Sequence, residues 1–340
     1  MLRLHEYRYL RPAHLAEALD LLHGREDAMP VAGGTDLVPN MKHRLWTPRL
    51  LVGLKGVEEM RGIRLEDAEG RPAAEDDGSA RFLSIGAAAT LAGTARDPRV
   101  RRLFPALAAA AGHVAGPQIR NQGTIGGNLC LDTRCTYYNQ SLFWRQALGF
   151  CLKKDGEVCH VTKVGKKCVA AHSADTPPVL MALGAEAELA SPEGVRRVPV
   201  EDFFVADGKW NTVRRPDELV VRVRVPLPPP RLRTAYRKLR QRNSVDFPLL
   251  SVALAAEVAE DGTVAAMSLV VSALGARPRV VSGLEKVAVG RPVGEVADAV
   301  AQQAFKQCHP LENLIVDPDW RRAMVPVYVR RAVEQVARGA

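Results

Sequence analysis

Four of the six cysteines in this chain lie in one short segment, and thiolates gathered in this way bind iron–sulfur clusters or zinc. Structural zinc sites usually contain cysteine pairs with about two to four residues between them, and no two of these four are that close. A [4Fe–4S] cluster accepts four thiolates from a long folded loop. We predict a [4Fe–4S] cluster as the metal centre, while zinc in a structural protein remains the alternative. The proposed ligands are Cys135, Cys151, Cys159 and Cys168.

Aromatic and basic side chains accompany the thiols. The aromatic residues between the first two thiols are expected to shield a cluster from water, and the lysines in the second half are expected to offset its negative charge and attract an acidic donor. The aromatic residues are Tyr137, Tyr138, Phe143, Trp144 and Phe150, and the lysines are Lys153, Lys154, Lys163, Lys166 and Lys167.

Two glycine loops indicate a second kind of chemistry. One is Ala32–Asp36, with the sequence AGGTD, and the other is Thr124–Asn128, with the sequence TIGGN. Paired glycines allow backbone N–H groups to approach a phosphate closely, and neighbouring hydroxyl groups add donors. Each loop is predicted to follow an apolar strand. Together they predict a clamp around the pyrophosphate of a dinucleotide, although either loop alone is also explained by a tight turn.

Composition limits the classes of protein to which the chain can belong. It has 340 residues, 47% of them hydrophobic, and no apolar run approaches the ~20 residues that span a bilayer. The N-terminus lacks the apolar core of a secretion signal, so we expect a reducing cytoplasm, where disulfides are rare. The net charge of +9 comes without a recognisable motif for reading nucleic acid. We therefore expect no nucleic-acid partner and no membrane partner.

Hydrophobic periodicity predicts an α+β chain of three units. Residues 1–60 form a small unit, with a helix over 13–23 and strands before the first glycine loop and over 51–58. Residues 61–228 form a second unit, which carries the cysteine-rich insert at about 131–172. The proline run Pro228–Pro230 marks a boundary. Residues 231–340 form a third unit, with a hairpin around Asp261–Gly262 and helices at its end.

The motifs PVAGGTDL, QIRNQGTIGGNL and Ser173-x-Asp175 occur in this order, and YRKLRQRNSVDFPLLSVA follows them. Together they resemble the FAD-binding medium subunit of the molybdenum hydroxylases, the family of xanthine and carbon monoxide dehydrogenases. The resemblance covers essentially the whole chain. It implies a vanillyl-alcohol-oxidase-type FAD fold (PCMH type) of two subdomains, with a flavoprotein C-terminal domain behind them.

The resemblance also implies the flavin contacts. Asp175 is expected to accept a hydrogen bond from the ribityl chain, with a helix cap as its alternative, and Lys238 is expected near the isoalloxazine ring. Cys130 belongs to the predicted strand TIGGNLC and is expected to pack beside the flavin, while Cys308 is expected to be inert. The remaining implied FAD contacts are Val31, Ala32, Gly33, Gly34, Thr35, Asp36, Leu37, Val114, Gly123, Thr124, Gly126, Gly127, Asn128 and Val220.

The insert resembles one branch of the family, the β subunit of 4-hydroxybenzoyl-CoA reductase. The resemblance implies that a ferredoxin-like donor supplies electrons through a [4Fe–4S] cluster and FAD to [2Fe–2S] and Mo-pterin centres on partner subunits. There the phenolic hydroxyl group of 4-hydroxybenzoyl-CoA is removed to give benzoyl-CoA. The implied assembly is a dimer of heterotrimers. A forward-running hydroxylase, in which the cluster is an electron outlet, remains the alternative within the family.

Overall fold

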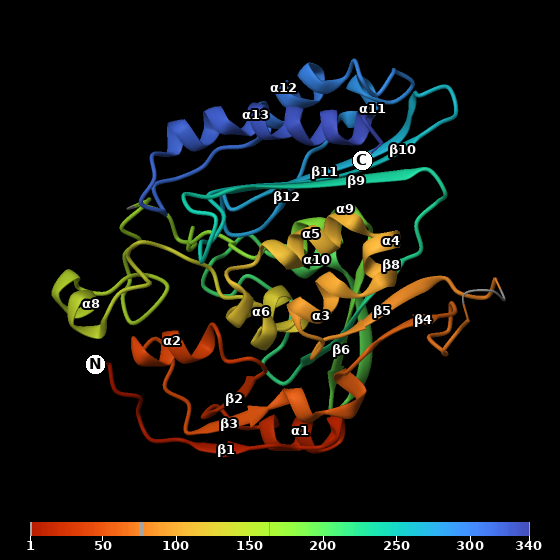
Figure 1. Cartoon of the computed structure of the whole chain (residues 1–340). Helices are drawn as coiled ribbons and strands as arrows, with labels where there is room; N and C mark the ends of the chain where they lie inside the picture. The colour runs from red at the N-terminus through yellow and green to blue at the C-terminus, as the bar shows by residue number, and fades with distance from the viewer. Residues whose placement is uncertain (1, 75–77, 163, 340) are drawn as a thin grey trace.

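The first unit is a three-stranded parallel sheet with helices around it. The structure, a computed structural model, describes residues 2–74, 78–162 and 164–339 (Figure 1). The central strand β3 is buried along its whole length, which agrees with its continuous apolar sequence LLVG. The strand order is β1-β3-β2. The elements are β1 (Arg8–Leu10), α1 (Leu15–Leu22), β2 (Ala28–Val31), α2 (Leu37–Lys42), β3 (Leu50–Gly53) and the 3₁₀ turns η1 (Leu54–Gly56) and η2 (Glu58–Met60).

The second unit is a five-stranded antiparallel sheet in the order β4-β5-β8-β6-β7. Its strands are β4 (Ile63–Glu66), β5 (Phe82–Gly86), β6 (Glu186–Ser191), β7 (Gly194–Pro199) and β8 (Leu219–Pro226). Its helices are α3 (Leu91–Arg96), α4 (Pro98–Leu103), α5 (Pro105–His113), α6 (Pro117–Gln122), α7 (Ile125–Leu129), α8 (Leu142–Leu148), α9 (Thr176–Ala182) and α10 (Val200–Phe203). One apolar core joins this unit to the first.

The third unit is a four-stranded antiparallel sheet, β12-β11-β10-β9, with helices on both faces. Helices α12 and α13 cover one face, while α5 and α9 of the second unit lie against the other (Figure 1). The expected hairpin is present, because β10 pairs with β11 across a turn in which Gly262 has a φ of +82°. The elements are β9 (Leu232–Leu239), β10 (Leu250–Val258), β11 (Val264–Ser272), β12 (Arg279–Val280), α11 (Leu284–Val287), α12 (Ala297–Gln307) and α13 (Pro318–Ala337). The α+β fold class expected from the sequence is confirmed.

The prediction of a strand at TIGGNLC is wrong, because these residues form the short helix α7. Thr124 begins the helix, and its hydroxyl oxygen accepts a 3.1 Å hydrogen bond from the N–H group of Gly127. Glycine is a poor helix former, but Gly126 lies against Ala87 so closely that an added Cβ would be 2.6 Å from the Cβ of Ala87. Tertiary packing therefore overrides local propensity. The second glycine loop consequently follows helix α6, whereas the sequence predicted that it follows a strand.

No helix in the described part of the chain is long and apolar enough to cross a membrane.

Candidate functional site

The two glycine loops lie side by side at the edge of a large cavity. A Cβ built on Gly33 would be only 2.1 Å from the backbone oxygen of Gln122, so the first loop touches the residues that begin the second. The cavity between the loops has a volume of about 820 Å³, within the usual range for a cofactor site. Gly127 is exposed toward it.

All the residues expected to contact FAD line this cavity, with the exception of Lys238. Both glycine loops contribute, together with Val114 at the end of α5, Asp175 before α9 and Val220 on β8. Asn128 holds the cavity wall together, because its side-chain oxygen accepts hydrogen bonds from the N–H and hydroxyl groups of Thr176 at 3.0 and 2.7 Å. The residues therefore form one cradle with room for a dinucleotide.

Lys238 lies behind the cavity wall in a buried ion pair. Its ammonium group is 2.9 Å from one carboxylate oxygen of Asp175 and donates a hydrogen bond to the His113 backbone oxygen at 3.0 Å. Tyr236 donates to the other oxygen of Asp175 at 2.5 Å. Asp175 stands at the helix start but makes no side-chain cap. The Lys238 side chain is buried, so it is not a surface lysine. Breaking a buried ion pair of this kind typically costs ~3–5 kcal/mol, and Lys238 therefore helps to hold Asp175 in the cavity wall.

The sequence analysis missed Asp132 and Arg134, two polar residues that line this cavity at the base of the insert, whereas it expected Cys130 beside the flavin. Cys130 is exposed toward the cavity, at the end of α7, instead of being packed within a strand. Arg134 forms an ion pair with Asp36 in the first glycine loop, and burial lowers the pKa of its guanidinium to about 10. The motif residues gave no signal for the ion pair of Arg134, since it joins the base of the insert to a distant loop.

The four cysteines of the insert, which are far apart in its sequence, line one small cavity. Apart from the cysteines, the lining is mostly apolar and aromatic, and the space that no atom fills is about 290 Å³, part of it open to solvent. Cys151, Cys159 and Cys168 are buried and Cys135 is half-buried. Burial raises the pKa of the Cys135 thiol and raises that of Cys168 to about 11. The residues other than the cysteines that line the cavity are Tyr137, Tyr138, Leu152, Lys153, His160, Val161, Val169 and Ala170.

The insert is fixed to the rest of the molecule at its base and at its sides. An antiparallel bridge between Arg134 and Ala171 closes the base. The buried guanidinium of Arg145 donates to the His43 backbone oxygen at 3.0 Å, just after α2. Asn313, in the third unit, accepts a 2.9 Å hydrogen bond at its backbone oxygen from the N–H group of Thr136. These contacts attach the insert to the body of the molecule, while α8 projects from it (Figure 1).

Two expectations about the insert need correction. Phe143 and Trp144 do not shield the cysteine cavity, because both lie on the projecting helix α8 with 82% and 37% of their surface exposed. Lys153 is buried and so cannot attract a donor from solution. Lys154 is partly exposed, Lys166 and Lys167 are exposed, and Lys163 lies outside the described residues.

Comparison with known proteins connects this architecture to one family. Residues 5–228 match the FAD binding domain in molybdopterin dehydrogenase, and residues 234–336 match the CO dehydrogenase flavoprotein C-terminal domain. The chain belongs to the FAD-binding subunits of the molybdenum hydroxylases. It is thus a flavin-binding subunit of an oxidoreductase. The iron–sulfur cluster stays a prediction.

Relatives of this molybdenum hydroxylase flavin subunit are found among several enzymes. It is 34% identical over 244 residues to an aldehyde oxidoreductase FAD-binding subunit of Escherichia coli, covering 69% of this chain and 72% of the relative. It is 26% identical to a putative xanthine dehydrogenase FAD-binding subunit of the same organism, covering 98% and 96%. Carbon monoxide dehydrogenase from Hydrogenophaga pseudoflava has a similar structure, with a TM-score of 0.77, 26% identity and 98% of both chains covered.

Proposed function

We propose that this chain is the FAD- and [4Fe–4S]-carrying electron-transfer subunit of a molybdenum enzyme that resembles 4-hydroxybenzoyl-CoA reductase. The enzyme would remove the phenolic hydroxyl group of 4-hydroxybenzoyl-CoA by reduction and release benzoyl-CoA. The observation that carries the proposal is the single cavity lined by Cys135, Cys151, Cys159 and Cys168. A flavin subunit that transfers electrons without this second centre would not need four converging thiols.

The residues around this cavity suit a cubane cluster in type and number. Four cysteines supply the four thiolates that a [4Fe–4S] cluster takes, and apolar and aromatic neighbours limit the access of water. Among the residues that the structure describes, no three His, Cys, Asp or Glu side chains form a group that could hold one metal ion. Zinc binds thiolates at about 2.3 Å and draws them closely together, so the zinc alternative gains no support from this geometry.

The large cavity suits FAD on equally specific grounds. The glycine loops would hold the pyrophosphate, and the cation of Arg134 lies in the same wall. Flavin, when bound, supplies a centre that exchanges either one or two electrons. The protein's own contribution is to fix the cofactor between two touching loops and to keep Asp175 in position through Lys238 and Tyr236.

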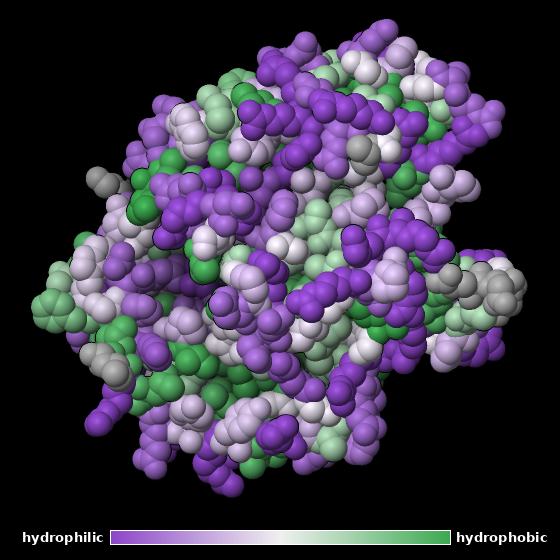
Figure 2. All heavy atoms as spheres, in the orientation of Figure 1, coloured by the Kyte–Doolittle hydropathy of each residue, from purple (hydrophilic) through white to green (hydrophobic). Residues whose placement is uncertain are grey.

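The proposal assigns only electron transfer to this chain, so the substrate must react on partner subunits. We propose a molybdenum-cofactor large subunit and a [2Fe–2S] small subunit, assembled as a dimer of heterotrimers in the cytoplasm. An acidic, ferredoxin-like protein is the proposed donor. It would dock beside α8, where the apolar side chains of Phe143, Trp144 and Leu148 are exposed, and the partly exposed Lys154 belongs to the same insert. Figure 2 shows apolar residues on the surface at the end of the molecule where α8 projects in Figure 1. Opposite charge would steer its approach.

A forward-running hydroxylase is the second candidate, and the similarity to aldehyde, xanthine and carbon monoxide enzymes favours it. In that case electrons leave through the flavin subunit toward an acceptor. The two candidates use the same cofactors in this chain and differ in the direction of electron flow.

A substrate assay on the co-expressed three-subunit enzyme separates these candidates. With reduced ferredoxin as donor, we expect 4-hydroxybenzoyl-CoA to be converted to benzoyl-CoA, measured by chromatography of the thioesters. A matched reaction without the donor should give no product, because the reaction consumes electrons. Oxidation of purines, aldehydes or carbon monoxide coupled to dye reduction, without conversion of the thioester, would contradict the proposal and support the forward hydroxylase.

A further inference from the structure

The buried side chain of Lys153 is the strongest feature of the insert that the proposed function does not use. Only 3% of this side chain is exposed. Its ammonium group is 2.6 Å from a carboxylate oxygen of Asp132 and donates to the Gly208 backbone oxygen at 2.8 Å. It also bonds to the hydroxyl and backbone oxygens of Thr133. A lysine is rarely buried so fully unless it is paired, and here four oxygen atoms of Asp132, Thr133 and Gly208 surround the ammonium group.

Lys153, besides pairing with Asp132, lies at the cysteine cavity. Lys153 is one of the residues that line this cavity, and its ammonium group lies 4.4 Å from the centre of the Tyr138 ring, which also lines the cavity. The electric field of this lysine therefore reaches the place where the thiolates would hold a cluster.

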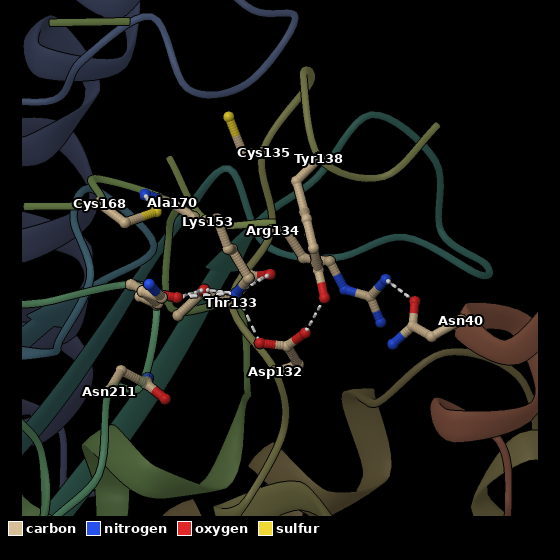
Figure 3. Close-up of polar contacts among 12 residues, drawn as sticks. Asn40, Asp132, Thr133, Arg134, Cys135, Tyr138, Lys153, Cys168, Ala170 and Asn211 are labelled. Atoms are coloured by element: carbon tan, nitrogen blue, oxygen red, sulfur yellow. Dashed lines mark hydrogen bonds and ion pairs between the residues drawn. The ribbon is translucent and has the colours of Figure 1, made fainter. Parts of the chain in front are cut away.

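One carboxylate connects the cysteine cavity with the flavin cavity. Asp132 accepts the ammonium group of Lys153 on one oxygen and a 2.8 Å hydrogen bond from the Tyr138 hydroxyl group on the other. Figure 3 shows both contacts converging on Asp132 from the side of Cys135. Asp132 itself lines the flavin cavity, whereas Lys153 and Tyr138 line the cysteine cavity. The three side chains thus form a continuous bridge between the two sites.

We propose that Lys153 and Asp132 act as an opposed pair of fixed charges that sets the reduction potential of the cluster, and that Tyr138 and Asp132 link the cluster site to the flavin site. This rests on the proposed function, since it requires a cluster in the cysteine cavity. An electron from the donor would add one negative charge to a cluster held by these thiolates. A buried cation nearby stabilises that added charge and raises the potential, while a carboxylate lowers it.

The exposed lysines of the insert cannot replace Lys153 in this role. Lys166 and Lys167 are exposed, so water and salt screen their charge. At equal distance, a charge in a protein environment with an effective dielectric constant of about 20 acts roughly fourfold more strongly than one in water, at about 80. Lys166 therefore provides a matched control, with the same loss of charge in the same segment.

The test compares Lys153→Met with Lys166→Met in the full chain, with the cluster's midpoint potential measured by anaerobic redox titration. We expect Lys153→Met to lower the potential, by roughly four times the shift of Lys166→Met or more. Asp132→Asn is expected to move the potential in the opposite direction, to a higher value. Lys153 should keep its place there, because Thr133 and Gly208 still accept its hydrogen bonds.

The proposal requires midpoint-potential shifts of opposite sign in Lys153→Met and Asp132→Asn. A merely structural role for the pair would give shifts of the same sign in both variants, or shifts no larger than the control, and either result would overturn the inference. Should Lys153→Met not fold, Asp132→Asn remains a test. If its midpoint potential did not rise, the inference would be overturned. Wild-type chain that contains FAD but no iron would instead refute the proposed function, so the two failures are distinguishable.

Discussion

Replacing Cys151 with serine is expected to remove the [4Fe–4S] signal, or convert it to a smaller cluster, while FAD stays bound. Cys151 is buried against Leu45 and Tyr138 and lines the cysteine cavity, so a serine there removes one of four thiolates and leaves a weaker ligand. Cys151 does not line the flavin cavity. Iron and flavin content of the anaerobically purified variant, with its visible spectrum, measure both effects. Turnover driven by ferredoxin should collapse, whereas dyes that reach flavin or molybdenum directly should still support some turnover.

Two other cysteines provide the controls for this variant. Cys308 is buried in the core of the third unit and lines neither cavity, so Cys308→Ala should keep both cofactors. Cys130 lines the flavin cavity and not the cysteine cavity, so Cys130→Ser should keep the iron. If Cys130→Ser lost the cluster while Cys135→Ser kept it, the proposed ligand set would be shifted by one thiol.

Replacing Gly127 with valine is expected to eliminate FAD binding while the fold and the cluster survive. Gly127 is exposed toward the cavity, and the nearest atom to an added Cβ is the Thr124 hydroxyl oxygen at 3.2 Å. The new methyl groups would occupy space that the cofactor needs. Overpacking of roughly 3 kcal/mol corresponds to about a hundredfold weaker binding. Flavin released on denaturation, compared with protein concentration, gives the occupancy.

The choice of glycine matters for this experiment. Gly294 has open space around an added Cβ and lies in the third unit, so Gly294→Val is a matched control that should retain FAD. Gly34 has a φ of +69°, and Gly33 would clash with the Gln122 backbone, so both substitutions would also strain the fold. Full flavin occupancy in Gly127→Val would show that the glycine loops do not hold the cofactor.

The sequence predicted the features that depend on local pattern. The hairpin at Asp261–Gly262 follows from turn chemistry, and the α+β class follows from hydrophobic periodicity. The glycine loops were expected to share one site because the paired glycines of both could clamp one pyrophosphate. Their direct contact at Gly33 and Gln122 could not be predicted, since it depends on how two distant segments pack.

The errors occur where tertiary contacts override local preference. A lysine in a polar, lysine-rich stretch is ordinarily exposed, but Lys153 is drawn inside by Asp132 and by the Gly208 backbone, 55 residues further along the chain. Phe143 and Trp144 resemble core residues in sequence, yet they lie on a helix that projects into solvent. Helix α7 likewise forms where a strand was expected, and Gly126 within it packs directly against Ala87.

Iron, acid-labile sulfide and FAD, measured together in the anaerobically purified full chain, test the central claim most directly. The account predicts about four iron and four sulfide for each flavin, together with the absorption of a [4Fe–4S] centre that bleaches on reduction. Chain that carries a full complement of FAD without iron, or with zinc in its place, would contradict it.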